Sequence, residues 1–292
     1  MDRRPAEMKD QLELDKENGY FMKETETNRE REKGRRGKKK KSLWFLNLLI
    51  VILIAVMVFC AYQIISQLLE DKKGKDVYGD VVSEAVMEET ETAIVESGGV
   101  EETVTLRKIN FQTLWGINKD VIGWLECENT IVNYPVVQGK DNEYYLKHLL
   151  DGTYHRFGTL FADCANAADF TDQNTVIYGH HIKVGTMFQM LDNYKEPDYY
   201  QEHPYFMLYL PDRTYRIELF AGCLVDGADG VPLNFSDAQE YQDYIDSLRA
   251  KSTFTSPVEM TAEDRMVTLY TCAYDFETAR YVVCGKLVEV TS

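Results

Sequence analysis

Residues 43–65 form an apolar run of 23 residues without a charged side chain. As an α-helix rising about 1.5 Å per residue, the run would span roughly 34 Å, enough to cross a hydrocarbon core of about 30 Å. It is apolar on every face, which disfavours a core helix of a globular domain. A cleaved signal peptide is the stronger alternative, but 42 residues precede the run and no small-x-small site follows it. Bulky Phe59 before Cys60 also disfavours a lipoprotein site, so we predict an uncleaved membrane anchor.

The charges beside this run predict its orientation. Residues 29–41 contain nine basic and two acidic side chains. Positive residues next to a membrane span stay on the cytoplasmic side and attract anionic lipids. A basic run can also bind nucleic acid, but its place directly before the anchor favours the topological role. We expect a single-pass protein of the cell membrane, with a cytoplasmic N-terminus and everything after about residue 66 extracellular.

Charge also separates the two sides of the anchor. Residues 1–66 carry 14 basic and 10 acidic side chains, whereas residues 67–292 carry 18 basic and 38 acidic ones. A domain this acidic is unsuited to binding nucleic acid. We therefore predict four segments, which are a disordered basic cytoplasmic tail at 1–42, the anchor at 43–65, an acidic stalk at 66–104 and a globular domain at 105–292.

The globular part is dominated by β-signals. A short helix is expected near residues 111–121, where apolar residues recur at helical spacing. A second helix is predicted to begin at Ser236, with Gln239 completing a capping box and apolar residues from Tyr241 to Leu248 on one face. Eight short strands with long connections favour a closed or nearly closed barrel. The expected strands are 121–125, 131–137, 159–162, 175–178, 205–210, 215–225, 266–271 and 280–290.

Two of these strands end beside residues that carry chemistry. The run 268–272, Thr-Leu-Tyr-Thr-Cys, ends in Cys272, and Arg280 follows eight residues later. The strand at 175–178 is followed by Gly179 and His180. A thiol attacks a carbonyl carbon, an imidazole moves the proton, and a guanidinium stabilises the oxyanion, so these three groups suit acyl transfer through a cysteine.

These motifs together resemble the sortases, and class B most closely. The resemblance covers residues 104–290 and rests on TLYTC (268–272), Arg280 in ARYVV (279–283), YGHHIKVGTMF (178–188) and NYPVVQGKDNEYYL (133–146). It implies a mainly β, eight-stranded sortase-like barrel with a few helices, preceded by an N-terminal transmembrane helix. Class B members often have Ser where this chain has Tyr270, so the resemblance describes the chemistry more closely than the substrate groove.

The resemblance also assigns roles to single residues. Cys272 is the expected nucleophile, His180 the general acid and base, and Arg280 the group that stabilises the substrate oxyanion. The family pattern places the active histidine directly after a Tyr-Gly pair, which selects His180 over His181, and neighbouring side chains of an extended chain point opposite ways. The residues expected to bind the sorting signal are Asn133, Val137, Tyr178, Tyr270 and Thr271.

The remaining cysteines and histidines have no such motif around them. Five cysteines follow the anchor, and an odd number leaves at least one free thiol even where disulfides form. Their spacing lacks the paired pattern of zinc sites, so no metal is predicted. Cys284 is expected in the core, and the surface is predicted for His148, His155 and His203.

The resemblance implies a cysteine transpeptidase without a cofactor. It would cleave a C-terminal sorting signal of secreted proteins at a Thr–Gly-type bond, through a thioacyl intermediate on Cys272. The acceptor would be a cell-wall amine, from a peptidoglycan precursor or wall peptide. The alternatives are a pilin-polymerising sortase with a lysine acceptor, a hydrolytic cysteine peptidase, and a non-catalytic wall-associated binding module. A papain-like enzyme is disfavoured because here the histidine precedes the cysteine in the chain.

Overall fold

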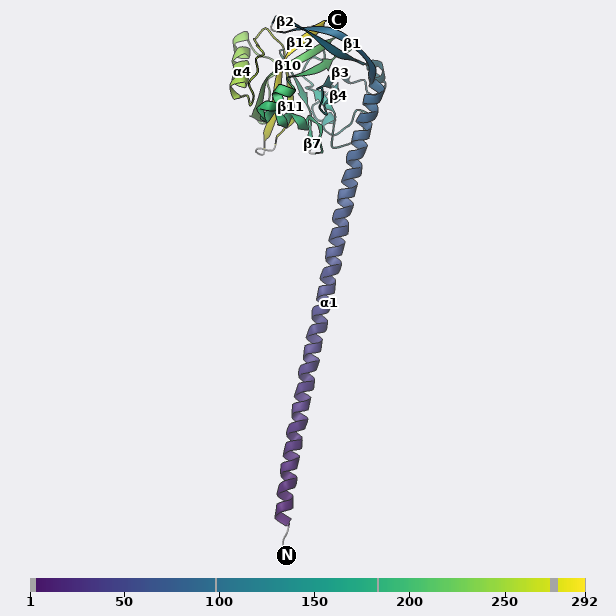
Figure 1. Cartoon of the computed structure of the whole chain (residues 1–292), viewed down its shortest axis with the longest axis vertical. Helices are drawn as coiled ribbons and strands as arrows, with labels where there is room; N and C mark the ends of the chain where they lie inside the picture. The colour runs from purple at the N-terminus through teal and green to yellow at the C-terminus, as the bar shows by residue number, and fades with distance from the viewer. Residues whose placement is uncertain (1–3, 98, 183, 274–277, 292) are drawn as a thin grey trace. The chain divides into compact units, whose positions relative to one another are not determined.

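The computed structural model describes the backbone of residues 4–97, 99–182, 184–273 and 278–291. The chain divides into two compact units, Met1–Leu68 and Leu69–Ser292. Residues 1–3 of the predicted tail and Lys183 of the histidine motif lie outside the described residues. Each unit is described by itself below, with the element labels of Figure 1.

The first unit consists of most of the helix α1 (Arg4–Ala85). Within the part of the chain that the structure describes, this is the one helix that is long and apolar enough to cross a membrane, over Trp44–Ala85. The helix also runs through residues 4–42, where we expected a disordered tail. This segment is rich in Glu, Lys and Arg, which are good helix formers, and it contains few glycines.

The second unit contains the predicted eight-stranded barrel. Its strands follow each other around the barrel in the order β10-β9-β3-β4-β5-β6-β11-β12, and the pairing of β10 with β12 closes the ring. All eight expected strands are present, each within two residues of its expected ends. Their bounds are β3 (Val121–Glu126), β4 (Asn133–Val137), β5 (Leu160–Ala162), β6 (Asn174–Tyr178), β9 (Tyr205–Tyr209), β10 (Thr214–Asp226), β11 (Met266–Cys272) and β12 (Ala279–Thr291).

A further hairpin extends the sheet where we expected an acidic stalk. Strand β1 (Val86–Ser97) pairs with the end of β12 and with β2 (Val100–Ile109). Apolar side chains that are two residues apart are buried on one face of the hairpin, namely Ala93, Val95, Val104 and Leu106. Thr92, Ile94, Thr103 and Thr105 alternate with them on the exposed face, and the apolar Ile94 hid this alternation in the sequence.

Helices and short turns connect the strands. The expected first helix is α2 (Phe111–Ile117), and the later one is α4 (Ala238–Lys251), which packs against β10 (Figure 1). The cap of α4 differs from the prediction, because Asp237 is the N-cap and accepts the Glu240 N–H at 2.8 Å. The Glu240 carboxylate in turn accepts the N–H of Ser236. The other elements are η1 (Tyr144–Leu146), β7 (His181–Ile182), β8 (Thr186–Met187), η2 (Phe188–Lys195) and α3 (Pro197–Glu202).

Candidate active site

The parallel strands β6 and β11 bring the histidine and cysteine motifs together. Their register pairs Leu269 with Ile177 and Tyr270 with Tyr178. Past the end of β6, Gly179 still donates its N–H to the Tyr270 carbonyl at 3.0 Å. The same register continued by two residues brings His180 beside Cys272. Parallel neighbours end at the same edge of a sheet, so this proximity follows from the topology.

Strand β12 brings the cation to the same place. Cys272 and Arg280 are directly paired across β11 and β12. Burial alternates along the strand ends, since Thr271 and Gly179 are buried while Tyr270, Cys272, Tyr178, His180 and Arg280 are half-buried. In an extended chain, alternate residues share a face. The thiol, the imidazole and the guanidinium therefore lie on one partly exposed face at the end of three neighbouring strands.

Cys272 is more exposed than three of the other thiols. All six cysteines are free, and Cys127, Cys223 and Cys284 are buried. Burial raises the pKa of Cys127 to about 12 and that of Cys223 to about 11, and it raises the pKa of Cys284 further. These three thiols are held in the unreactive protonated form. The prediction that Cys284 belongs to the core is confirmed.

The hydrogen bond of His180 determines which ring nitrogen is basic. Nε2 lies 2.6 Å from the carbonyl oxygen of Leu146, and a carbonyl only accepts, so Nε2 carries the proton. Nδ1 is then the nitrogen available to take a proton. Burial lowers the pKa of His180 below its usual 6.5, and the Leu146 carbonyl opposes this by stabilising the charged ring. The imidazole is thus mostly neutral at neutral pH.

His181 points to a different part of the molecule. Its side chain is 7% exposed, and Nε2 lies 3.8 Å from a carboxylate oxygen of Asp192 on η2. Asp192 also pairs with Lys195 at 2.7 Å. The two adjacent imidazoles therefore have separate surroundings, as the alternation of an extended chain predicts.

Arg280 is held at the start of β12. Its Nη1 donates to the carbonyl oxygens of Ala279 at 2.9 Å and Thr278 at 3.3 Å. The positive charge also lowers the pKa of Asp226, after the stronger effect of the Ala228 N–H and a hydrogen bond from Thr278. One end of the guanidinium is thereby fixed by backbone carbonyls.

Two tyrosines border the three groups. The rings of Tyr178 and Tyr270 meet edge to face with centroids 5.2 Å apart. The Tyr178 hydroxyl donates to Asp163 at 2.8 Å, and Asn142 donates to the same carboxylate oxygen at 2.9 Å. Asp163 is 8% exposed and holds Tyr178 in place. Sequence reasoning did not single out Asp163, because no motif surrounds it and its partner is 15 residues away.

Comparison with known proteins agrees with this geometry. A family profile for the sortase domain matches residues 125–288. The chain is 32% identical over 243 residues to a sortase B of Listeria monocytogenes, covering 82% of this chain and 95% of the relative. A Staphylococcus aureus sortase B–substrate complex superposes with a TM-score of 0.59 at 35% identity, covering 61% of this chain and 84% of that one. A sortase B complexed with triglycine gives 0.57 at 34% identity, covering 61% and 85%.

The chain belongs to the sortase family, in class B. Sortases are cysteine transpeptidases, so this one is an enzyme of that type.

The predicted substrate residues of this sortase occupy different environments. Val137 is fully buried, and Thr271 is 1% exposed and donates its hydroxyl to the Gly179 carbonyl at 2.8 Å. Asn133 accepts the indole N–H of Trp124 at 2.8 Å. Only the two tyrosines lie on the same half-buried face as the cysteine. Their contact with a sorting signal stays a prediction, as it does for the other three residues.

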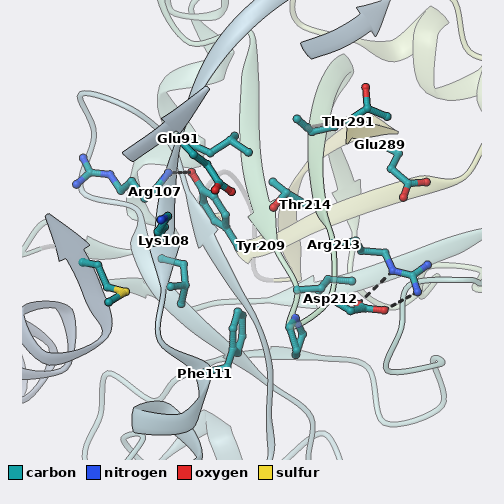
Figure 2. Close-up of a pocket in the computed structure, with 16 residues that line it drawn as sticks. Glu91, Arg107, Lys108, Phe111, Tyr209, Asp212, Arg213, Thr214, Glu289 and Thr291 are labelled. Carbon is teal, nitrogen blue, oxygen red and sulfur yellow. Dashed lines mark hydrogen bonds and ion pairs between the residues drawn. The ribbon is translucent and has the colours of Figure 1, made fainter. Parts of the chain in front are cut away.

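A cavity of about 700 Å³ lies elsewhere in this sortase, at the far end of β12 (Figure 2). Glu289 and Thr291 line it, and roughly 33 Å of extended strand separates them from Arg280. Four of its charged side chains are already paired: Arg107 with Glu126, Lys108 with Glu89, and Arg213 with Asp212, the last pair drawn in Figure 2. Among the described residues, no group of three or more His, Cys, Asp or Glu is placed to hold a metal ion.

Proposed function

We propose that this sortase cleaves a C-terminal sorting signal of secreted proteins and transfers the new carboxyl end to a cell-wall amine. The observation that carries the proposal is the pairing of Cys272 with Arg280 on the face that also bears His180. A nucleophile, a proton carrier and an oxyanion donor within one site are what acyl transfer through a cysteine requires. Both the sequence motifs and the strand topology support this assignment.

In the first half-reaction Cys272 attacks the scissile carbonyl carbon. The thiol proton passes to Nδ1 of neutral His180, and the guanidinium of Arg280 stabilises the negative charge on the carbonyl oxygen. The tetrahedral species then collapses. The peptide C–N bond breaks, the leaving amine takes the proton from His180, and a thioester remains on Cys272.

The second half-reaction reverses these roles. An acceptor amine attacks the thioester carbon and loses a proton to His180. Arg280 again stabilises the oxyanion, and the C–S bond breaks. The thiolate takes the proton back, and the product carries a new amide bond. The hydrogen bond from Nε2 to Leu146 keeps the same ring nitrogen available in both halves.

We further propose that residues 43–65 anchor this sortase in a membrane of a Gram-positive cell. The apolar part of α1 supports this, and the nine basic residues at 29–41 support a cytoplasmic N-terminus. Protease added to intact wall-stripped cells should then digest the region after residue 70 and spare the tail. The reverse pattern of protection would overturn the orientation.

The transpeptidase proposal is tested by product analysis. The full chain in detergent is incubated with a library of peptides that contain a Thr–Gly bond, together with triglycine and lysine peptides as acceptors. Triglycine is chosen because a sortase B has been crystallised with that peptide. Mass spectrometry should show cleaved peptides extended by triglycine. Hydrolysis products alone would indicate a cysteine peptidase, and transfer to lysine peptides alone would indicate a pilin polymerase. No turnover of any peptide would favour a binding module.

A further inference from the structure

The end of α1 contacts a turn of the barrel unit at residues 155–159. Nε2 of His155 lies 2.9 Å from the Glu70 carbonyl oxygen, and Nε of Arg156 donates to Asp71 at 3.0 Å. The predicted surface position of His155 is wrong, because the helix covers it and leaves it 1% exposed. Asp71 is 6% exposed in the same contact. The helix is thus closely packed against this turn.

About two helical turns further on, the packing is equally close. The Tyr78 hydroxyl donates to the Gly158 carbonyl at 2.6 Å and lies 2.9 Å from the Thr159 hydroxyl. Tyr78 is 4% exposed. A Cβ added to Gly74 would lie only 2.5 Å from the His155 ring, so the helix sits as near to the turn as a glycine allows.

The same turn supports the backbone that holds the ring of His180. Thr159 donates its N–H to the Tyr145 carbonyl at 3.0 Å. Gly158 has a positive φ of 62°, and an added Cβ there would overlap the carbonyl oxygens of Tyr145 and Leu146. The Leu146 carbonyl is the group that accepts Nε2–H of His180 at 2.6 Å. Three short contacts, from Tyr78 to Gly158, from Gly158 to Leu146 and from Leu146 to His180, therefore link the Tyr78 hydroxyl to the imidazole.

The helix also reaches the segment that follows the histidine. Nζ of Lys75 donates to the Val184 carbonyl at 3.2 Å, in the connection between β7 and β8. Further along, the Phe188 N–H donates to the carbonyl oxygen of His180 itself. The end of α1 thus contacts both the turn that packs against the Leu146 backbone and the segment that follows His180.

We infer that residues 70–78 of α1 form a positioning element for His180, acting through the 155–159 turn and the Leu146 carbonyl. The inference rests on the proposed role of His180 in proton transfer. None of these helix residues contacts the reacting groups. They hold in place the acceptor that orients the ring and selects Nδ1 as the basic nitrogen. The helix that continues the predicted anchor therefore contributes to catalysis as well as to attachment.

Loosening the contact between α1 and the 155–159 turn should lower the pKa of His180. Burial lowers the pKa of His180, and the hydrogen bond to the Leu146 carbonyl raises it. Weakening that hydrogen bond should lower the pKa further, by about one pH unit, which is roughly what a hydrogen bond to a charged group is worth. The ring would also be less well aligned. We expect kcat to fall about tenfold, short of the 10²-fold that a misplacement of about 1 Å can cost.

The glycines of the helix supply a matched pair of variants. Gly74→Ala places a methyl group against His155, whereas Gly79→Ala meets nothing within 4 Å. Both changes raise helix propensity equally. A second pair removes one buried tyrosine hydroxyl each. Tyr78→Phe breaks the contact with the turn, and Tyr209→Phe breaks a hydrogen bond to Glu126 away from the site.

The experiment uses the full chain in detergent and measures two quantities. NMR titration of the His180 ring reports its pKa and tautomer, and peptide cleavage reports kcat, KM and their pH profile. Gly74→Ala and Tyr78→Phe should lower the His180 pKa and kcat with little change in KM. Gly79→Ala should behave like the unmodified chain, and Tyr209→Phe should lower thermal stability without moving the His180 pKa.

An unchanged His180 pKa and pH profile in folded Gly74→Ala and Tyr78→Phe would overturn the inference. A loss of stability without a change in the His180 pKa would also overturn the inference, because it would show that the contact only stabilises the fold. The proposed function fails in a different way. In that case the unmodified chain itself shows no cleavage that depends on His180, while the NMR titration still reports whether the helix positions the ring.

Discussion

Two adjacent histidines with separate surroundings allow a direct test of the site. His180→Ala removes the proposed proton carrier, whereas His181→Ala removes a buried ring that faces Asp192. General acid–base groups contribute about 10²- to 10⁴-fold to rate, equivalent to about 2.7–5.4 kcal/mol of transition-state stabilisation. His180→Ala should therefore lower kcat/KM by about that factor.

For His181, the structure predicts a clear loss of stability and only a small loss of activity. Its removal opens a cavity and leaves Asp192 with Lys195 as a partner at 2.7 Å. Losses of this kind cost about 0.5–3 kcal/mol of unfolding free energy. We expect His181→Ala to lower the urea midpoint clearly while kcat/KM falls less than about tenfold.

Peptide cleavage and urea unfolding are measured on both variants in the same buffer. A matched loss of activity in the two folded variants would refute the assignment of the rings to separate environments. A larger loss for His181→Ala would reverse the assignment altogether.

Three further predictions concern the ends of the same three strands. Arg280→Ala should lower kcat by about 10²- to 10³-fold. Arg280→Lys should recover only part of the lost rate, because lysine keeps the charge but lacks the planar guanidinium. Full activity of an Arg280→Ala variant that is folded by circular dichroism would remove the guanidinium from the mechanism. Thr271→Val leaves the Gly179 carbonyl without its hydroxyl donor and should cost about 1–3 kcal/mol in urea unfolding, and an unchanged midpoint would contradict this role. Since neutral His180 accepts the thiol proton and burial lowers its pKa, kcat/KM should rise with pH through a midpoint below 6.5, and a midpoint above that value would be inconsistent with the buried ring.

Local patterns were sufficient to predict the barrel strands. Most of the strands are short, rich in β-branched and aromatic residues, and bounded by turn residues, so their positions can be predicted from a few neighbouring residues. The sequence predicted a closed or nearly closed barrel, but it did not predict that β10 and β12 would close it. The actual pairing depends on the bend of long strands and on long-range contacts, which no local pattern contains.

The parts that sequence reasoning missed share a physical cause. The hairpin β1–β2 was hidden because its exposed face includes the apolar Ile94 beside threonines, so the sequence shows no clean apolar–polar alternation. His155 was expected on the surface because its burial comes from a helix 85 residues earlier in the chain. The cap of α4 moved by one residue because Ser236 and Asp237 are both good caps and only the final backbone geometry chooses between them.

The candidate site could be predicted from the sequence for a different reason. The motif at 268–272 and the Gly-His pair lie at the ends of two strands, and their resemblance to sortases supplied the roles. The register of β6 against β11 then accounts for why residues so far apart in sequence meet. The support of Tyr178 by Asp163 comes from the loop after β5, and that of His180 by Leu146 comes from the short helix η1. The positions of both segments depend on tertiary packing.

The central claim is that acyl transfer passes through Cys272. Intact-mass spectrometry of the full chain, quenched with acid during cleavage of a sorting-signal peptide, tests it most directly. We predict a mass increase equal to the acyl fragment, located on Cys272 by peptide mapping, absent from Cys272→Ala, and lost on addition of an acceptor amine. The Cys164→Ala variant, which removes another exposed thiol, should retain the adduct. Turnover by Cys272→Ala, or an adduct on any other cysteine, would contradict the account.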